Sequence, residues 1–274
     1  MKVTVDSVVD CLKRHGMGVN NDLNLVSFRG LLVNKEEAVL NDNRIDYFND
    51  TMMVVMPKKG LLYNFRCTAG EPGWYWINHP SYRGPSSGAP FTCPGQYYYV
   101  KGIHRGHEAF VQQNSERGRL KVVRDVDQNG KLDRRDLIDR PLHTGINIHA
   151  EGSRSQNVGA SSSGCHVLYG NWADSWWEQF HALLYHSGLS VFPYTVLEGG
   201  WFFDGVPRVL MGSKGSAVKN VQAILEKKGM DLLQDGLFGH ETDKRVGRWQ
   251  AMNGELPTGI VEGRSKWMKE NVFS

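Results

Sequence analysis

Two side chains that together can perform nucleophilic catalysis lie close together in the sequence. His149 ends the β-prone run Ile146–Ile148, and Cys165 follows three small residues, Ser162, Ser163 and Gly164. A cysteine thiol with a pKa of about 8.5 is mostly protonated at neutral pH, and a neighbouring imidazole can take up its proton and leave a reactive thiolate. The pattern therefore predicts a thiol–imidazole pair. The competing interpretation is a free cysteine buried in a core.

The segment Thr144–Leu168 resembles the catalytic domain of L,D-transpeptidases of the YkuD type, whose signature is His-Gly, a gap, and then Ser-x-Gly-Cys. The resemblance implies that Cys165 is the nucleophile and His149 its base. It also implies that Ser162, Ser163 and Gly164 shape the oxyanion hole, in which backbone N–H groups stabilise the developing negative charge.

Two departures from this signature bear on the reaction. Ala150 follows the histidine where the family has glycine, and Val167 stands where the family has an arginine two residues after the cysteine. If that arginine holds a substrate carboxylate, water could replace the acceptor amine, which would make the protein a peptidase. A third residue should orient His149, and the candidates are His143, His104, His107 and His166.

The segment Asp125–Asp136 matches a twelve-residue calcium-binding loop. Oxygen-bearing side chains stand at positions 1, 3, 5, 9 and 12, Gly130 at position 6 allows the sharp turn, and Leu132 is the apolar residue at position 8. A strand precedes the loop, so it is not half of an EF-hand pair. The alternative is an Asn-Gly hairpin turn with solvated acids. The ligands expected for a structural Ca²⁺ are Asp125, Asp127, Asn129, Lys131, Asp133 and Asp136.

The segment Leu210–Val261 has the periodicity of a small helical bundle. Apolar residues at helical spacing predict a helix from Val218 to Leu225 that Gly229 ends, and Thr242 is predicted to cap a second helix. A third short helix is expected around Trp267.

This pattern resembles the family of three-helix peptidoglycan-binding domains, with Trp249 where the family usually has phenylalanine. The resemblance implies that bacterial peptidoglycan is the partner. The matched positions are Gly215, Val218, Gln222, Leu225, Gly229, Asp235-Gly236, Phe238-Gly239, Thr242, Val246, Gln250, Leu256, Gly259 and Ile260.

The elements that must position these residues indicate an α+β chain. We expect a β-rich domain over residues 1–207, similar to L,D-transpeptidases, and an all-α three-helix bundle over 208–274. Helices are predicted at Val5–His15 and at Trp172–Tyr185, the latter capped by Asn171, and a long loop at Asn78–Pro94. The predicted strands are Leu31–Val33, Met52–Met56, Leu61–Phe65, Trp74–Ile77, Gln96–Val100, Leu120–Val123 and Ser190–Leu197.

Composition fits a soluble globular chain, with 40% hydrophobic and 22% charged among 274 residues. Residues 208–274 hold 11 Lys/Arg against 8 Asp/Glu, so the net charge of +3 lies in the small domain. No apolar run approaches the ~20 residues that a membrane span needs. The acidic start Met1–Asp10 lacks an apolar segment, so we expect no signal peptide, synthesis in a host cytoplasm and action in the periplasm or wall after release. We expect no organic cofactor, no nucleic-acid partner and a monomer.

The leading hypothesis is a cysteine-dependent peptidoglycan hydrolase that cleaves stem-peptide bonds, such as a phage endolysin. The alternative is an L,D-transpeptidase or L,D-carboxypeptidase, including an antibacterial effector injected into rival cells. A third possibility is a wall-binding virion protein without catalytic activity.

Overall fold

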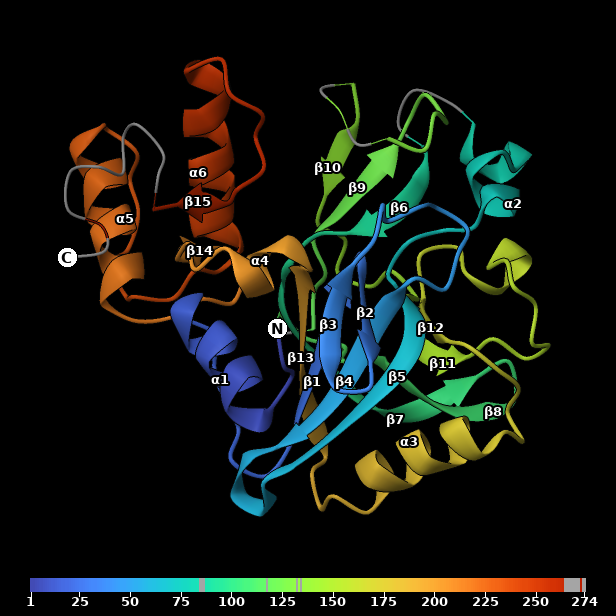
Figure 1. The fold of residues 1–274 in the computed structure, drawn as a ribbon. Helices are drawn as coiled ribbons and strands as arrows, with labels where there is room; N and C mark the ends of the chain where they lie inside the picture. Colours follow the sequence, from blue (N-terminus) through green and yellow to red (C-terminus); the bar gives the residue numbers. More distant parts are fainter. Residues whose placement is uncertain (84–86, 117, 132, 134, 264–271, 273–274) are drawn as a thin grey trace.

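The computed structural model describes residues 1–83, 87–116, 118–131, 133, 135–263 and 272. At its centre eight strands form a closed barrel in the order β1-β13-β7-β8-β11-β12-β5-β4 (Figure 1). The pairs β1–β13 and β11–β12 are parallel, and the other neighbouring pairs are antiparallel. The barrel strands are β1 (Asn24–Arg29), β4 (Asp50–Met56), β5 (Leu61–Ala69), β7 (Gly95–His104), β8 (His107–Gln112), β11 (Ile148–Ala150), β12 (His166–Leu168) and β13 (Val191–Glu198).

Smaller sheets and helices surround the barrel. One sheet has three strands, β6 (Ala89–Thr92), β9 (Val122–Asp125) and β10 (Leu137–Asp139), in the order β10-β9-β6. Two further pairs are β2 (Leu31–Asn34) with β3 (Glu37–Leu40), and β14 (Arg208–Val209) with β15 (Val261–Glu262). The helices are α1 (Val5–Arg14), α2 (Trp74–Ile77), α3 (Ser175–Tyr185), α4 (Gly200–Phe203), α5 (Ser216–Lys227) and α6 (His240–Met252), with 3-10 turns η1 (Pro57–Lys59), η2 (Pro80–Tyr82) and η3 (Gly159–Ser161). Among the described residues, none of the helices has the length and apolar character to cross a membrane.

Side-chain alternation along the strands divides the core between the inside and the outside of the barrel. On β1, Leu25 packs inside, whereas Val26 and Phe28 point outward and pack with α1. Helix α1, which the sequence period predicts, begins with a capping box between Thr4 and Ser7. The β-rich region followed by helices confirms the predicted fold class.

Several local predictions were wrong. Trp74–Ile77 is the helix α2 and not a strand, because four residues carry too little periodicity and Trp76 Nε1 donates a tertiary hydrogen bond to Ala160 O at 3.0 Å. The predicted loop 78–94 contains strand β6, which pairs with β9. Asp174, not Asn171, is the N-cap of α3.

The C-terminal helices α5 and α6 are joined by one buried glutamine. Gln222 Nε2 donates to Asp235 Oδ1, to Leu237 O and to Thr242 Oγ1, and Gln222 Oε1 accepts from Gly236 N. Helix α6 starts at His240 after the N-cap Gly239, so the predicted cap Thr242 is instead a buried partner of Gln222. The third expected helix, around Trp267, and Leu132 of the calcium-type loop lie outside the described residues.

Buried ion pairs hold the C-terminal helices against the barrel. Asp243 on α6 is fully buried; its Oδ1 accepts from Lys121 Nζ at 2.6 Å and its Oδ2 from Arg140 Nε at 2.7 Å. Lys121 also donates to Thr258 O. Because Lys121 itself is only 3% exposed, each charge depends on the others for the solvation that water no longer supplies.

Replacing Asp243 should show how strongly the buried cations depend on it. We expect Asp243→Ala to lower the free energy of unfolding by about 3–5 kcal/mol, since Lys121 would stay buried without its counter-ion. Urea denaturation followed by tryptophan fluorescence measures the change. Glu241→Ala, an exposed acid on the same helix, is the control and should change stability by less than about 0.5 kcal/mol. Equal small effects of the two substitutions would contradict the structural role of the pair.

Candidate functional site

The parallel ladder between β11 and β12 places the predicted histidine on β11 and the predicted cysteine immediately before the neighbouring strand β12. The register pairs Ile148 with His166 and His149 with Val167, and His166 N donates to Asn147 O. Because side chains alternate, Ile148 packs inside the barrel, whereas His149, Val167 and the preceding Cys165 point outward. The two candidate catalytic side chains therefore leave the same outer face of neighbouring strands.

The Cys165 thiol is almost fully enclosed. The thiol is 5% exposed and packs with Phe48, Val158 and Val167. Its Sγ accepts a hydrogen bond from Asn147 N at 3.5 Å and can donate to Gly145 O at 3.8 Å. Burial raises the pKa of the Cys165 thiol, and the Asn147 N–H and the Arg105 charge oppose that rise. The resting thiol is therefore protonated at neutral pH.

The backbone, not another side chain, fixes the tautomer of His149. Nδ1 lies 2.7 Å from Ala150 O, so Nδ1 carries the proton and donates it, which leaves the lone pair on Nε2. Nε2 is buried, and no hydrogen-bond partner is found for it in the part of the chain that the structure describes. Burial lowers the pKa of His149 to about 3, with smaller contributions from His104 and Arg105. A neutral imidazole with a free Nε2 can accept a proton.

The other candidate histidines lie beside His149 or inside the barrel. His104 stacks on His149 with ring centroids 4.2 Å apart, and Asn147 Nδ2 lies 3.0 Å from His104 Nδ1. His107 stacks on Trp172, whose ring lies parallel to that of His149 at 6.0 Å. His166 points into the barrel, where its Nδ1 lies 2.9 Å from Tyr194 Oη.

No contact between His143 and the candidate base is found among the described residues. His143 is exposed, and Nδ1 of His149 is held by Ala150 O. His143 was chosen from its place in the sequence, whereas the orienting group is a backbone carbonyl that every residue carries.

The small residues before the cysteine form a tight turn. Ser162 Oγ bonds with Glu71 O and Cys165 O, both at 2.9 Å, and accepts from Gly164 N at 3.1 Å. Gly164 has φ 114°, and a Cβ there would lie 2.6 Å from Pro90 O, so only glycine fits. The half-buried Ser163 pairs with Pro72 in an isolated bridge. Ser162 and Gly164 thus shape the turn, and the Gly164 N–H is already used within it.

Groups far away in the chain support this turn from outside, and no pattern in the sequence points to them. Gly73 N donates to Ser162 O at 2.9 Å, which places α2 directly on the turn. Arg29 is buried, donates to Ala69 O and lies 3.7 Å from Glu71, whose backbone carbonyl accepts from Ser162. Burial raises the pKa of Glu71, and Arg29 lowers it. A lone charged residue in a β-rich segment gives no sequence signal that it will be buried.

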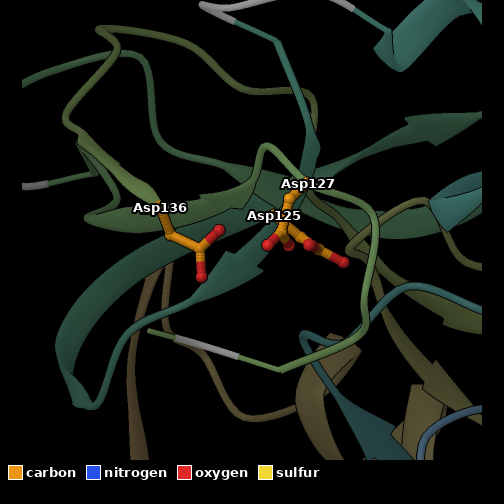
Figure 2. Close-up of side chains that lie close together, drawn as sticks. All are labelled: Asp125, Asp127 and Asp136. Atoms are coloured by element: carbon orange, nitrogen blue, oxygen red, sulfur yellow. The ribbon is translucent and has the colours of Figure 1, made fainter. Parts of the chain in front are cut away.

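Three of the predicted metal ligands gather at one point. Carboxylate oxygens of Asp125, Asp127 and Asp136 lie within 4.8 Å of one another (Figure 2). Burial raises the pKa of Asp125 and of Asp136, and the neighbouring acids add to both shifts. Such acids, held together against their repulsion, could be stabilised by a cation that prefers oxygen ligands.

The other predicted ligands make contacts within the loop. Asn129 Oδ1 accepts from Lys131 N at 2.6 Å, and the carboxylate of Asp133 pairs with Arg135. Arg135 also lies 2.8 Å from Asp127. A bound cation would have to compete with Arg135 for these oxygens.

The loop also contacts the elements around Cys165. Gln128 Nε2 donates to Ile77 O, the last residue of α2, at 2.7 Å. Gly130 lies so close to Trp74 that a Cβ there would be 2.5 Å from the indole ring. The calcium-type loop therefore supports α2, and α2 supports the turn before Cys165.

Comparison with known proteins identifies only the C-terminal part. Residues 214–264 match the family described as "Putative peptidoglycan binding domain". The chain has no significant match among curated proteins, and none among solved structures. The segment is thus a peptidoglycan-binding domain, and association with cell wall follows from it. The match does not extend to the barrel, which remains without an assigned family.

The buried imidazole makes stability depend on pH. His149 has a pKa of about 3 in the folded protein against 6.5 in the unfolded chain, so its contribution is complete above pH 6.5 and is lost as pH falls toward 3. At pH 5 the loss should be about 2 kcal/mol. The free energy of unfolding, measured by urea titration, should therefore fall between pH 7 and pH 5 by about 2 kcal/mol less in His149→Gln than in the wild type. The exposed His143→Gln should leave the slope unchanged; equal slopes in all three proteins would contradict the assignment.

Proposed function

We propose that the protein is a cysteine-dependent peptidoglycan hydrolase that cleaves stem-peptide bonds, with Cys165 as nucleophile and His149 as base. The observation that carries this proposal is the placement of both side chains on one outer face of the β11–β12 ladder. The hydrogen bond from Nδ1 to Ala150 O supports it further, because it leaves the Nε2 lone pair for the thiol proton. The C-terminal domain would hold the enzyme on its substrate.

The proposed reaction proceeds through a thioester. Nε2 of His149 takes the thiol proton while Sγ of Cys165 attacks the scissile carbonyl carbon. The C–N bond then breaks, and the imidazolium gives its proton to the leaving amine. Water, deprotonated by His149, attacks the thioester, releases the carboxylic acid and restores the thiol. Transfer to an amine in place of water would give the L,D-transpeptidase alternative.

The biological setting is part of the same proposal. A phage endolysin and an antibacterial effector both combine a peptidoglycan-cleaving domain with a wall-binding domain, and both act on the wall from inside or after injection. Hydrolysis, which the two settings share, is favoured over transfer because Val167 stands where L,D-transpeptidases have an arginine, and the endolysin is the leading form of this proposal.

One observation favours the non-catalytic alternative. The Cys165 side chain is only 5% exposed and burial raises its pKa, which is also what an inert core cysteine shows. In that case the barrel would be a structural partner of a wall-binding protein.

Digestion of purified sacculi separates these possibilities. We expect the wild-type protein to release shortened stem peptides detectable by mass spectrometry, and Cys165→Ala to reduce that release more than about 1000-fold. Cys93→Ala, which removes another buried free thiol, is the matched control and should retain activity. New 3–3 cross-links would indicate transfer. An intact muropeptide profile with the wild-type protein would refute the enzymatic proposal.

We further propose that the Asp125–Asp136 loop binds Ca²⁺ as a structural ion. The carboxylates of Asp125, Asp127 and Asp136 would supply the charged ligands. The ion would stabilise the loop that contacts Trp74 and Ile77. It would therefore act on the turn before Cys165 only through α2.

Thermal denaturation with calcium or a chelator tests this proposal. At a calcium concentration 100 times Kd, binding should stabilise the fold by about 2.7 kcal/mol and raise the Tm accordingly. Asp127→Asn should abolish the calcium-dependent shift. Asp42→Asn, an exposed acid outside the loop, should keep it. A wild-type Tm that is the same in calcium and in chelator would rule out a structural ion here.

A further inference from the structure

A cavity of about 880 Å³ lies where the barrel meets the C-terminal domain. From the barrel side it is lined by Tyr98, Glu116 and Arg119, and from the C-terminal domain by His240, Arg245 and other residues of the matched segment. The Lys121–Asp243–Arg140 ion pairs hold the two parts together. The cavity is therefore formed by two parts of the chain that buried ion pairs join.

The lining of this cavity carries charges of both signs. Arg119, Lys214 and Arg245 are basic, and the acids are Glu116, Asp231, Asp235 and Glu241. Some of these charges are already paired: Arg119 with Glu116 at 2.7 Å, and Arg245 with Glu241 at 3.7 Å. A ligand with both carboxylates and an amine would complement such a surface better than an uncharged one.

Two buried nitrogen atoms of lining residues have no hydrogen-bond partner in the described structure. They are Nε of Arg119, on the barrel side, and Nδ1 of His240, at the start of α6. The two side chains lie near enough that the Arg119 charge, after burial, lowers the pKa of His240. Nε of Arg119 is itself enclosed, but the Arg119 side chain is 22% exposed, so its terminal N–H groups can donate to a ligand carboxylate in the cavity.

We propose that this cavity binds the stem peptide of peptidoglycan, with Arg119 of the barrel holding one of its carboxylates. The sugar rings of the glycan are uncharged, whereas the stem peptide carries carboxylates and a free amine and so matches the mixed charges of the lining. The barrel thus completes the binding site of the C-terminal domain. This inference rests on the wall-binding domain and not on Cys165, so it is tested separately from hydrolysis.

Calorimetric titration of the full chain with soluble fragments tests the proposal. Cys165→Ala is used throughout so that the fragments stay intact. We expect a disaccharide-tetrapeptide to bind, and the same disaccharide without its peptide to bind at least tenfold more weakly. Arg119→Ala should weaken tetrapeptide binding at least tenfold, and Arg119→Lys should recover part of it. Arg248→Ala, an exposed arginine on α6 that does not line the cavity, is the control and should bind normally.

Three results would overturn the proposal: no binding of the tetrapeptide fragment, equal binding of the two fragments, or unchanged affinity in Arg119→Ala. The Tm of each variant shows whether it is folded. If Arg119→Ala does not fold, Arg245→Ala replaces it, because Arg245 lines the same cavity from the C-terminal domain. A tenfold loss in that variant would support the proposal, and an unchanged affinity would overturn it. Digestion of sacculi by the Cys165-containing protein reports on the proposed hydrolysis independently of these affinities.

Discussion

The parallel pairing of β11 with β12 is the constraint on which the candidate site depends. Parallel neighbours cannot be joined by a tight turn, so the chain must leave the barrel after Ala150 and return before His166. That excursion carries η3 and the turn Ser162–Gly164, and it ends at Cys165, immediately before the strand that neighbours His149. The position of the thiol is fixed on one side by the ladder and on the other by α2, through Gly73 and Trp76.

Burial disfavours the charged form of both candidate catalytic groups, the thiolate of Cys165 and the imidazolium of His149. It raises the pKa of Cys165 and lowers that of His149, so the resting pair is a neutral thiol and a neutral imidazole. A preformed thiolate–imidazolium pair is therefore not the resting state. Proton transfer would have to accompany attack on the substrate, with Arg105 as the charge that favours the thiolate.

Short-range patterns were readable from the sequence, and long-range contacts were not. The apolar period of Val5–His15 and the turn glycines around Gln222 are encoded within a few residues, so the sequence predicts helix α1 and the C-terminal domain. The pairing of His149 with Cys165 stays a prediction; His149 lies on β11, and Cys165 immediately precedes the neighbouring strand β12. In contrast, α2 forms through contacts with a segment more than 80 residues away, as the Trp76–Ala160 hydrogen bond shows.

Large separation in the sequence also explains why the buried charges at the C-terminal helices are not predicted. Lys121, Arg140 and Asp243 look like ordinary surface residues until the C-terminal helices pack on the barrel. Asp243 lies 122 residues from Lys121 and 103 residues from Arg140 in the sequence. No local periodicity can report such a contact, because it depends on where two separately formed parts meet.

These long-range contacts converge on the β9–β10 hairpin. Lys121 immediately precedes β9 and Arg140 immediately follows β10, so the base of the hairpin carries both cations that hold Asp243 of the C-terminal domain. At its other end the calcium-type loop contacts α2 through Gln128 and Gly130, and the hairpin stands between α6 and α2 (Figure 1). The wall-binding domain and the turn before Cys165 are therefore connected through one hairpin. If Cys165 acts on the wall as proposed, this hairpin would relate the position of the wall-binding domain to that of the thiol, because its base contacts Asp243 and its loop contacts α2.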